Sequence, residues 1–263
     1  MTALLQPLKV EVGQFGVAGQ HLATLEATLA RGLPEITHPA VCMHDGTLVV
    51  VGSGPSLPTM TEEIRTEQQK GRPICAVNGA HDFLCEQGII PNLFLTVDAR
   101  DLRHNLKQKN GQTVYLIASR CAPEVFDHLR GHRILLWHSM GKNEEADFLK
   151  PRVPFLIGGG STSGLRAISV GYFAFGFRNF LLFGMDSCND AQGRKRFDSG
   201  RVSINTDVIV GERTFQCNMA MAAQANEFQT ATYGWMPDIH LEARGDGLLA
   251  AILAERKRVG KHV

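Results

Sequence analysis

The chain has 263 residues, 44% of them hydrophobic, and a formal net charge of +1. This length suits one large α/β domain or two small ones, and the near-zero charge gives no global field that would attract nucleic acid or an anionic membrane surface. The six cysteines are scattered without a C-x-x-C pair, which argues against a disulfide framework or a zinc site. The first residues lack the basic start and apolar core of a signal peptide, and no apolar run is long and uninterrupted enough to span a membrane, so we expect a cytoplasmic protein without a membrane segment.

The predicted elements begin with an amphipathic helix over 19–34, which Gly32 and Pro34 end. From Thr47 to residue 186, short apolar runs then alternate with helical patterns. We expect strands over 47–51, 73–78, 92–98, 113–119, 132–138, 153–160 and 179–186, and helices over 59–71, 80–89, 122–131 and 161–176. Because this alternation indicates βαβ units and the runs are apolar throughout, the predicted class is α/β, Rossmann-like, with a mostly parallel sheet covered by helices on both faces.

After residue 186 the pattern changes. The stretch 207–217 predicts a β-hairpin with Gly211 and Glu212 as its two-residue turn. A helix over 218–234, a strand over 238–243 and a final helix over 245–261 follow. We therefore divide the chain into an N-terminal helical segment, 1–40, and a Rossmann-like domain, 41–263, that includes this C-terminal hairpin and its helices.

Two loops of small residues adjoin the predicted strands, at the edge where parallel sheets bind ligands. The first comprises Gly52, Ser53, Gly54, Pro55 and Ser56, and the second comprises Gly158, Gly159, Gly160, Ser161, Thr162 and Ser163, with Arg166 one turn further on. Backbone N–H groups in such loops, with the positive end of the next helix, can hold phosphate. Each loop also has a purely structural explanation, as a tight turn or a helix cap. We expect Gly54→Val, which adds a bulky side chain, to remove nucleotide binding while leaving the fold roughly intact.

Three polar residues follow predicted strands. Asp98 and Asp186 are candidate Mg²⁺ ligands, because this ion prefers one or two carboxylates beside phosphate oxygens, but each could equally cap a turn. Asn78 could hydrogen-bond a ribose or a base, or it could serve only as the first residue of an Asn-Gly turn.

These motifs resemble the MptE-like 6-hydroxymethylpterin diphosphokinase family, whose relatives include motility-associated-factor proteins and phage or prophage proteins. The resemblance is carried in order by "VVVGSGPSL", "ICAVNGAHDFLCEQGIIPNLFLTVDAR", "GGGSTSGLRAISVGYFAFGFRNFLLFGMDSC" and "GDGLLAAIL". It implies a Rossmann-like fold and ATP- and Mg²⁺-dependent transfer of a diphosphate to the hydroxymethyl group of a reduced pterin. It also implies that the two glycine loops hold the nucleotide phosphates and that Asp98 and Asp186 hold the metal and serve catalysis by neutralising charge.

The same loops also look like those of bacterial sialyltransferases, which use a CMP-sugar and carry Asn where this chain has Ser53. Two alternatives to the diphosphokinase therefore stay open: a glycosyltransferase-like enzyme that uses a nucleotide-sugar, and a phage-type accessory protein that binds a nucleotide without catalysis. The expected partners are a nucleotide and a small-molecule acceptor, not nucleic acid. Self-association is left open.

Overall fold

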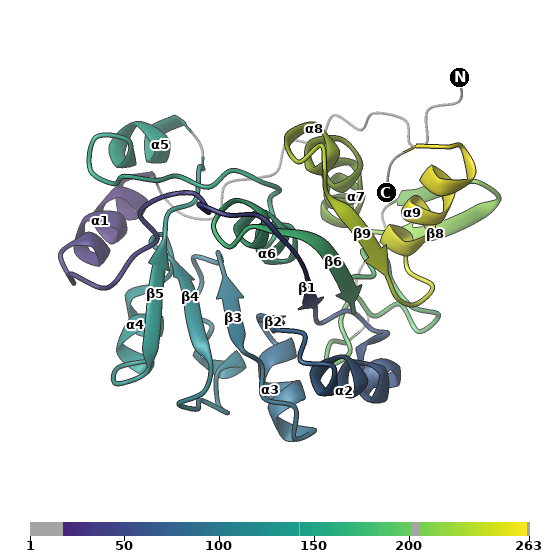
Figure 1. Ribbon diagram of the computed structural model, residues 1–263, viewed down its shortest axis with the longest axis horizontal. Helices are drawn as coiled ribbons and strands as arrows, with labels where there is room; N and C mark the ends of the chain where they lie inside the picture. The colour runs from purple at the N-terminus through teal and green to yellow at the C-terminus, as the bar shows by residue number, and fades with distance from the viewer. Residues whose placement is uncertain (1–17, 142, 201–205, 262–263) are drawn as a thin grey trace.

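The computed structural model describes residues 18–141, 143–200 and 206–261 (Figure 1). Its centre is a seven-stranded sheet with the order β5-β4-β3-β2-β1-β6-β9, in which every pairing is parallel. The strands are β1 (His44–Val51), β2 (Ile74–Val77), β3 (Leu93–Thr96), β4 (Val114–Ala118), β5 (Arg133–Trp137), β6 (Phe177–Phe183) and β9 (His240–Ala243). A separate antiparallel hairpin consists of β7 (Thr206–Val210) and β8 (Arg213–Cys217). The predicted α/β class is thus confirmed.

Helices cover both faces of the sheet. They are α1 (Ala18–Leu29), α2 (Thr61–Gln69), α3 (Ala80–Glu86), α4 (Pro123–His128), α5 (Asn143–Leu149), α6 (Ser163–Phe173), α7 (Met219–Glu227), α8 (Tyr233–Trp235) and α9 (Leu248–Arg258). Short 3₁₀ turns lie at η1 (Leu57–Met60) and η2 (Arg103–Asn105), and η3 (Phe228–Thr232) is a π-helical turn. Among the described residues, no helix is both long and apolar enough to cross a membrane.

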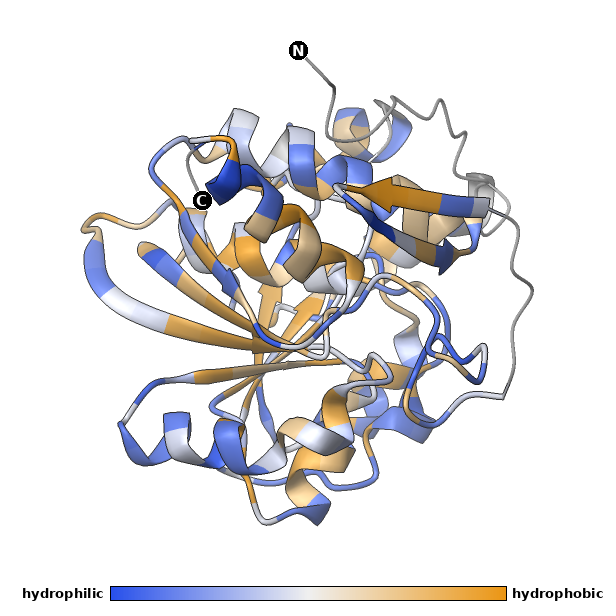
Figure 2. Cartoon of the chain, turned by 90° about the vertical axis from the view of Figure 1, so that its right-hand side faces the viewer, coloured by the Kyte–Doolittle hydropathy of each residue, from blue (hydrophilic) through white to orange (hydrophobic). Residues whose placement is uncertain are grey.

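The alternation of side chains along β1 explains the two layers. Val49 and Val51 pack with Ile64 of α2 and Leu84 of α3 in one core cluster, whereas Val50 belongs to the cluster that holds α6 and α9. Figure 2 shows the result, with apolar strands lying between two layers of helices. Because both faces are covered there, the strand segments at the centre of the sheet, such as Leu48–Val51 of β1 and Ile74–Val77 of β2, are buried and apolar, as the sequence pattern indicated.

The strand order creates one switch point. From β1 the chain adds β2, β3, β4 and β5 on one side, and it later adds β6 and β9 on the other. The carboxyl ends of β1 and β6 are therefore neighbours whose connections leave in opposite directions. In an open parallel sheet this is where a ligand crevice forms, so the topology singles out the loops after β1 and β6.

One predicted strand is wrong. The stretch 153–160 forms only an isolated bridge, between Ile157 and Ser139. Pro154, which has no N–H to donate to a sheet, and the three glycines that begin at Gly158 explain why this apolar stretch does not extend the sheet. The helix α5, which the sequence analysis did not anticipate, lies just before it and packs with α1 through Leu25, Leu149 and Val153.

The C-terminal elements largely follow the prediction. The hairpin turns at Gly211 and Glu212, with Val210 opposite Arg213 and Gly211 at φ +59°. The helix expected over 218–234 is instead divided into α7, the π-helical turn η3 and α8. The N-terminal helix is present as α1.

Candidate functional site

The loop after β1 is fastened to the loop after β6. Gly52 N–H donates to the Phe183 carbonyl and Gly54 N–H donates to the Gly184 carbonyl, each at 2.8 Å. Ser56 N–H donates to Asp186 Oδ2 at 2.9 Å. Three of the loop's backbone donors are therefore engaged within the protein at the switch point.

The glycines of this loop allow that close approach. A Cβ placed on Gly52 would lie 2.6 Å from the Gly184 carbonyl oxygen. A Cβ placed on Gly54 would lie 2.6 Å from the same oxygen and would overlap Asp186 Oδ2. The expectation that a bulky residue at Gly54 leaves the fold intact is therefore wrong, because backbone and a buried carboxylate already occupy the space.

Asp186 lies at the centre of this junction. Only 5% of the residue is exposed, and its carboxylate accepts hydrogen bonds from the Ser56 hydroxyl at 2.7 and 2.8 Å as well as from the Ser56 N–H. Its carbonyl accepts the Leu248 N–H, which leads into α9. Burial raises the pKa of Asp186, the donors of Ser56 lower it, and the nearby Asp190 raises it, with a net shift upward.

The second glycine loop enters α6. Thr162 is the N-cap residue, and its hydroxyl oxygen accepts the Leu165 N–H at 3.4 Å. Ser163 Oγ accepts the Val97 N–H at 3.2 Å, which ties the start of α6 to the end of β3. Ser161 donates both its N–H and its hydroxyl to the Glu227 carboxylate. A Cβ on Gly159, at φ +127°, would collide with the Ser169 side chain.

Asn78 and Asp98 follow the two neighbouring strands β2 and β3. Asn78 adopts φ 50°, and its buried Oδ1 has no hydrogen-bond partner in the part of the chain that the structure describes. Asp98 accepts two hydrogen bonds from Arg100 Nε, at 2.9 and 3.1 Å. Burial raises the pKa of Asp98, but hydrogen bonds and charge from Arg100 together lower it by more, so the net shift of the pKa is downward.

The structure brings these residues to one edge of the sheet but keeps the two aspartates apart. Strands β3 and β6, which lead into Asp98 and Asp186, are three positions apart in the sheet, which corresponds to about 14 Å between the two strands. A single Mg²⁺ cannot take both as direct ligands at that separation. Asp98 is already paired with Arg100, and Asp186 already accepts hydrogen bonds from Ser56. The two carboxylates therefore fit a directly bound Mg²⁺ poorly.

The sequence analysis did not predict three charged residues that lie at this edge of the sheet. Arg120 lies two residues after the end of β4, a position near a strand end that could have singled it out. Glu227 reaches Ser161 from a helix 66 residues away, and no local pattern signals that contact. Arg196 lies over the start of α3, where its Nη2 would be 2.7 Å from a Cβ on Gly79.

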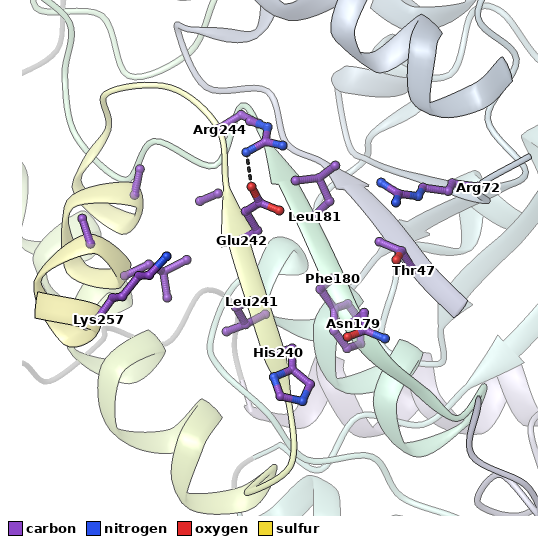
Figure 3. A pocket seen from close by; sticks show the side chains of 14 residues that line it. Thr47, Arg72, Asn179, Phe180, Leu181, His240, Leu241, Glu242, Arg244 and Lys257 are labelled. Carbon is purple, nitrogen blue, oxygen red and sulfur yellow. Dashed lines mark hydrogen bonds and ion pairs between the residues drawn. The ribbon is translucent and has the colours of Figure 1, made fainter. Parts of the chain in front are cut away.

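A cavity of about 520 Å³ lies elsewhere, on β6, β9 and α9 (Figure 3). Its lining includes Arg72, Asn179, His240, Glu242 and Lys257, and none of the predicted site residues. The strand topology and the hydrogen bonding therefore favour the carboxyl edge of the sheet as the ligand site. The size of the cavity would instead favour the region on β6, β9 and α9. We place the candidate site at the carboxyl edge, because the switch point and the unpartnered Asn78 oxygen both lie there.

Comparisons with known proteins identify the family of the chain and a protein of similar fold. The sequence model of the family described as "6-hydroxymethylpterin diphosphokinase MptE-like" matches residues 23–192, which include both glycine loops, Asn78, Asp98 and Asp186. The fold is similar to that of the MAf glycosyltransferase from Magnetospirillum magneticum AMB-1, with a TM-score of 0.70 and 16% sequence identity. That match covers 92% of this chain and 42% of the glycosyltransferase, so this chain corresponds to less than half of that protein. A search of curated proteins finds no match.

Proposed function

Since the chain belongs to the MptE-like family, we propose that it is a nucleotide-dependent transferase with its site at the carboxyl edge of β1, β2, β3 and β6. The family description favours transfer of a diphosphate from ATP to a hydroxymethyl group. In that reaction the hydroxymethyl oxygen attacks the β-phosphorus of ATP, and the bond from that phosphorus to the α–β bridging oxygen breaks. AMP leaves, and the hydroxyl proton is released to solvent.

The main structural support for the proposal comes from Asn78. Its side-chain oxygen is buried and unpartnered among the described residues, and its backbone adopts a positive φ. An unsatisfied buried acceptor and a left-handed backbone each cost free energy, and such costs cluster at functional sites. A ribose hydroxyl or a base amino group of a bound nucleotide would supply the missing donor.

The other residues of the edge would position the ligand. Ser161 would donate to phosphate oxygens once a ligand displaced Glu227, and Ser53 offers a hydroxyl group near the switch point, where the Ser56 hydroxyl is held by Asp186. Asp98 and Asp186 would orient the acceptor or shape the charge around the reacting phosphates. Because phosphoryl transfer depends mainly on positioning and charge stabilisation, such groups account for most of what the reaction requires.

A second candidate is transfer of a sugar from a nucleotide-sugar. It is supported by the similarity of the fold to a MAf glycosyltransferase. Both reactions would place a nucleotide at the same edge and differ in the group that is transferred, so the choice of nucleotide separates them.

The test is a thermal-shift screen of ATP, CMP, UDP and their sugar conjugates, each with and without Mg²⁺. A nucleotide at 100 times its Kd stabilises the folded state by about 2.7 kcal/mol, which corresponds to a rise in Tm of several degrees. We expect ATP to raise the Tm and to yield AMP when a reduced hydroxymethylpterin is added. A rise with CMP or UDP conjugates instead would support the second candidate, binding without turnover would indicate an accessory protein, and no rise with any nucleotide would contradict the proposal.

A further inference from the structure

The donors at the start of α6 are occupied by a carboxylate of the chain itself. Ser161 N–H and the Ser161 hydroxyl donate to the same atom, Glu227 Oε2, at 2.8 and 2.7 Å. One turn earlier on α7, Gln224 Nε2 donates to Thr162 Oγ1 at 3.1 Å. Helix α7 therefore holds the α6 entry at two points and presents an anionic group to the donors that a phosphate would use.

A buried guanidinium lies under the same loop. Arg166 is 7% exposed, and its Cδ would lie 3.7 Å from a Cβ placed on Gly159. Its Nη1 and Nη2 donate to the carbonyls of Ile157 and Met140, at 2.8 and 3.1 Å, and its Nε has no partner among the residues that the structure describes. The buried charge is thus hydrogen-bonded to neutral carbonyls, and its Nε–H is unused.

Two guanidinium groups and two carboxylates lie close together around Arg166. Arg120 interacts electrostatically with Arg166, and its Nη2 lies 3.4 Å from Glu145 while its buried Nε has no partner in the described chain. Burial, followed by repulsion from Arg120, lowers the pKa of Arg166 to about 10, although Glu227 and Glu145 oppose the shift. The Glu227 carboxylate is therefore part of the charge that compensates the Arg166 guanidinium, whereas Arg120 is paired with Glu145.

Glu227 lies where α7 passes into a π-helical turn. It is half-buried at the last position of α7, and the next residues form the π-helical turn η3. Such turns are less regular than an α-helix and frequently occur at functional sites. Trp235, which follows at the end of α8, is 53% exposed and rests on Gly158 at the edge of the same loop.

We propose that Ser161, Arg166 and Arg120 form an anion site for a phosphate group, and that Glu227 fills this site until the phosphate displaces it. A phosphate carries more charge and more acceptor oxygens than a carboxylate, so it can take both Ser161 donors and also reach a guanidinium. The inference extends the proposed function, because it assigns a phosphate subsite to the same edge. It does not depend on which nucleotide, if any, the protein uses.

The probe is inorganic diphosphate, titrated calorimetrically into the full chain. The Glu227→Gln variant removes the competing charge and nearly preserves the shape, so we expect it to bind diphosphate on the order of tenfold more tightly than the wild type. Adding Ser161→Ala or Arg120→Gln to that variant should abolish the gain. The matched control is Glu86→Gln, which makes the same charge change at the exposed end of α3 and should leave the affinity unchanged.

A Glu227→Gln affinity equal to or weaker than that of the wild type would overturn the inference. If that variant does not fold, the wild type still provides a test, because displacement of Glu227 must change the environment of the Ser161 amide. Its NMR resonance should then move as diphosphate saturates the protein, and binding without that change would also overturn the inference. The two proposals can fail separately. If the variants bind diphosphate as expected but the protein binds no nucleotide, the anion site is supported and the proposed function is contradicted.

Discussion

Two buried or half-buried carboxylates determine how the glycine loops are built. Asp186 accepts the donors of Ser56 after β1, and Glu227 accepts the donors of Ser161 before α6. In each loop, small residues let the chain pass close to other groups of the protein, and the hydroxyl and amide donors then meet an internal anion. The glycines at the switch point are thus required by the fold itself, whatever ligand the edge binds.

Gly54 provides the clearest test at this scale. Gly54→Ala should destabilise the protein by about 1–3 kcal/mol, because the added methyl group overlaps Asp186 and the Gly184 carbonyl and forces the two loops apart. The measurement is urea unfolding followed by circular dichroism. Gly111→Ala is the matched control, since nothing lies within 4 Å of its added Cβ, and it should change stability by no more than about 0.5 kcal/mol. Equal stabilities of the two variants would contradict the packing described here.

The elements differ in how well local sequence predicts them. Strands such as β1 and β4 were predicted because their apolar runs are bounded by turn residues and buried on both faces. The stretch around Ile157 has the same apolar character, but it lies beyond the sheet edge, where only one bridge to Ser139 forms. No local pattern indicates that α7 passes through a π-helical turn, because that geometry depends on how the helix packs against the rest of the molecule.

A helix cap at the start of α6 was one structural explanation that the sequence offered for the second glycine loop. The structure identifies Thr162 as the N-cap residue, and its oxygen also accepts Gln224 Nε2. Thr162→Ala should therefore cost about 1 kcal/mol of stability, through loss of the cap, whereas Thr162→Ser should retain most of it. Chemical denaturation of the two variants makes the comparison. Equal losses in both would mean that the methyl group, rather than the hydroxyl, matters there.

At the scale of the whole molecule, the topology places the candidate site. Asn78, Asp98 and the two glycine loops were predicted as site residues because each adjoins a strand end, and parallel strands bring such ends to one edge. The order of the strands, which separates Asp98 from Asp186 by two intervening strands, could not be predicted from local patterns. The long-range contact of Glu227 with Ser161 could not be predicted from local patterns either, because it depends on how α7 is placed relative to the start of α6.

The central claim is that a nucleotide binds at the carboxyl edge and not in the cavity on β6, β9 and α9. The most direct measurement is amide chemical-shift mapping with the nucleotide that gives the largest thermal shift. The account predicts that the largest changes fall on the loops Gly52–Ser56 and Gly158–Ser163 and on Asn78, with Arg72, His240 and Lys257 nearly unchanged. The largest changes at those last three residues, which line the cavity of Figure 3, would contradict it.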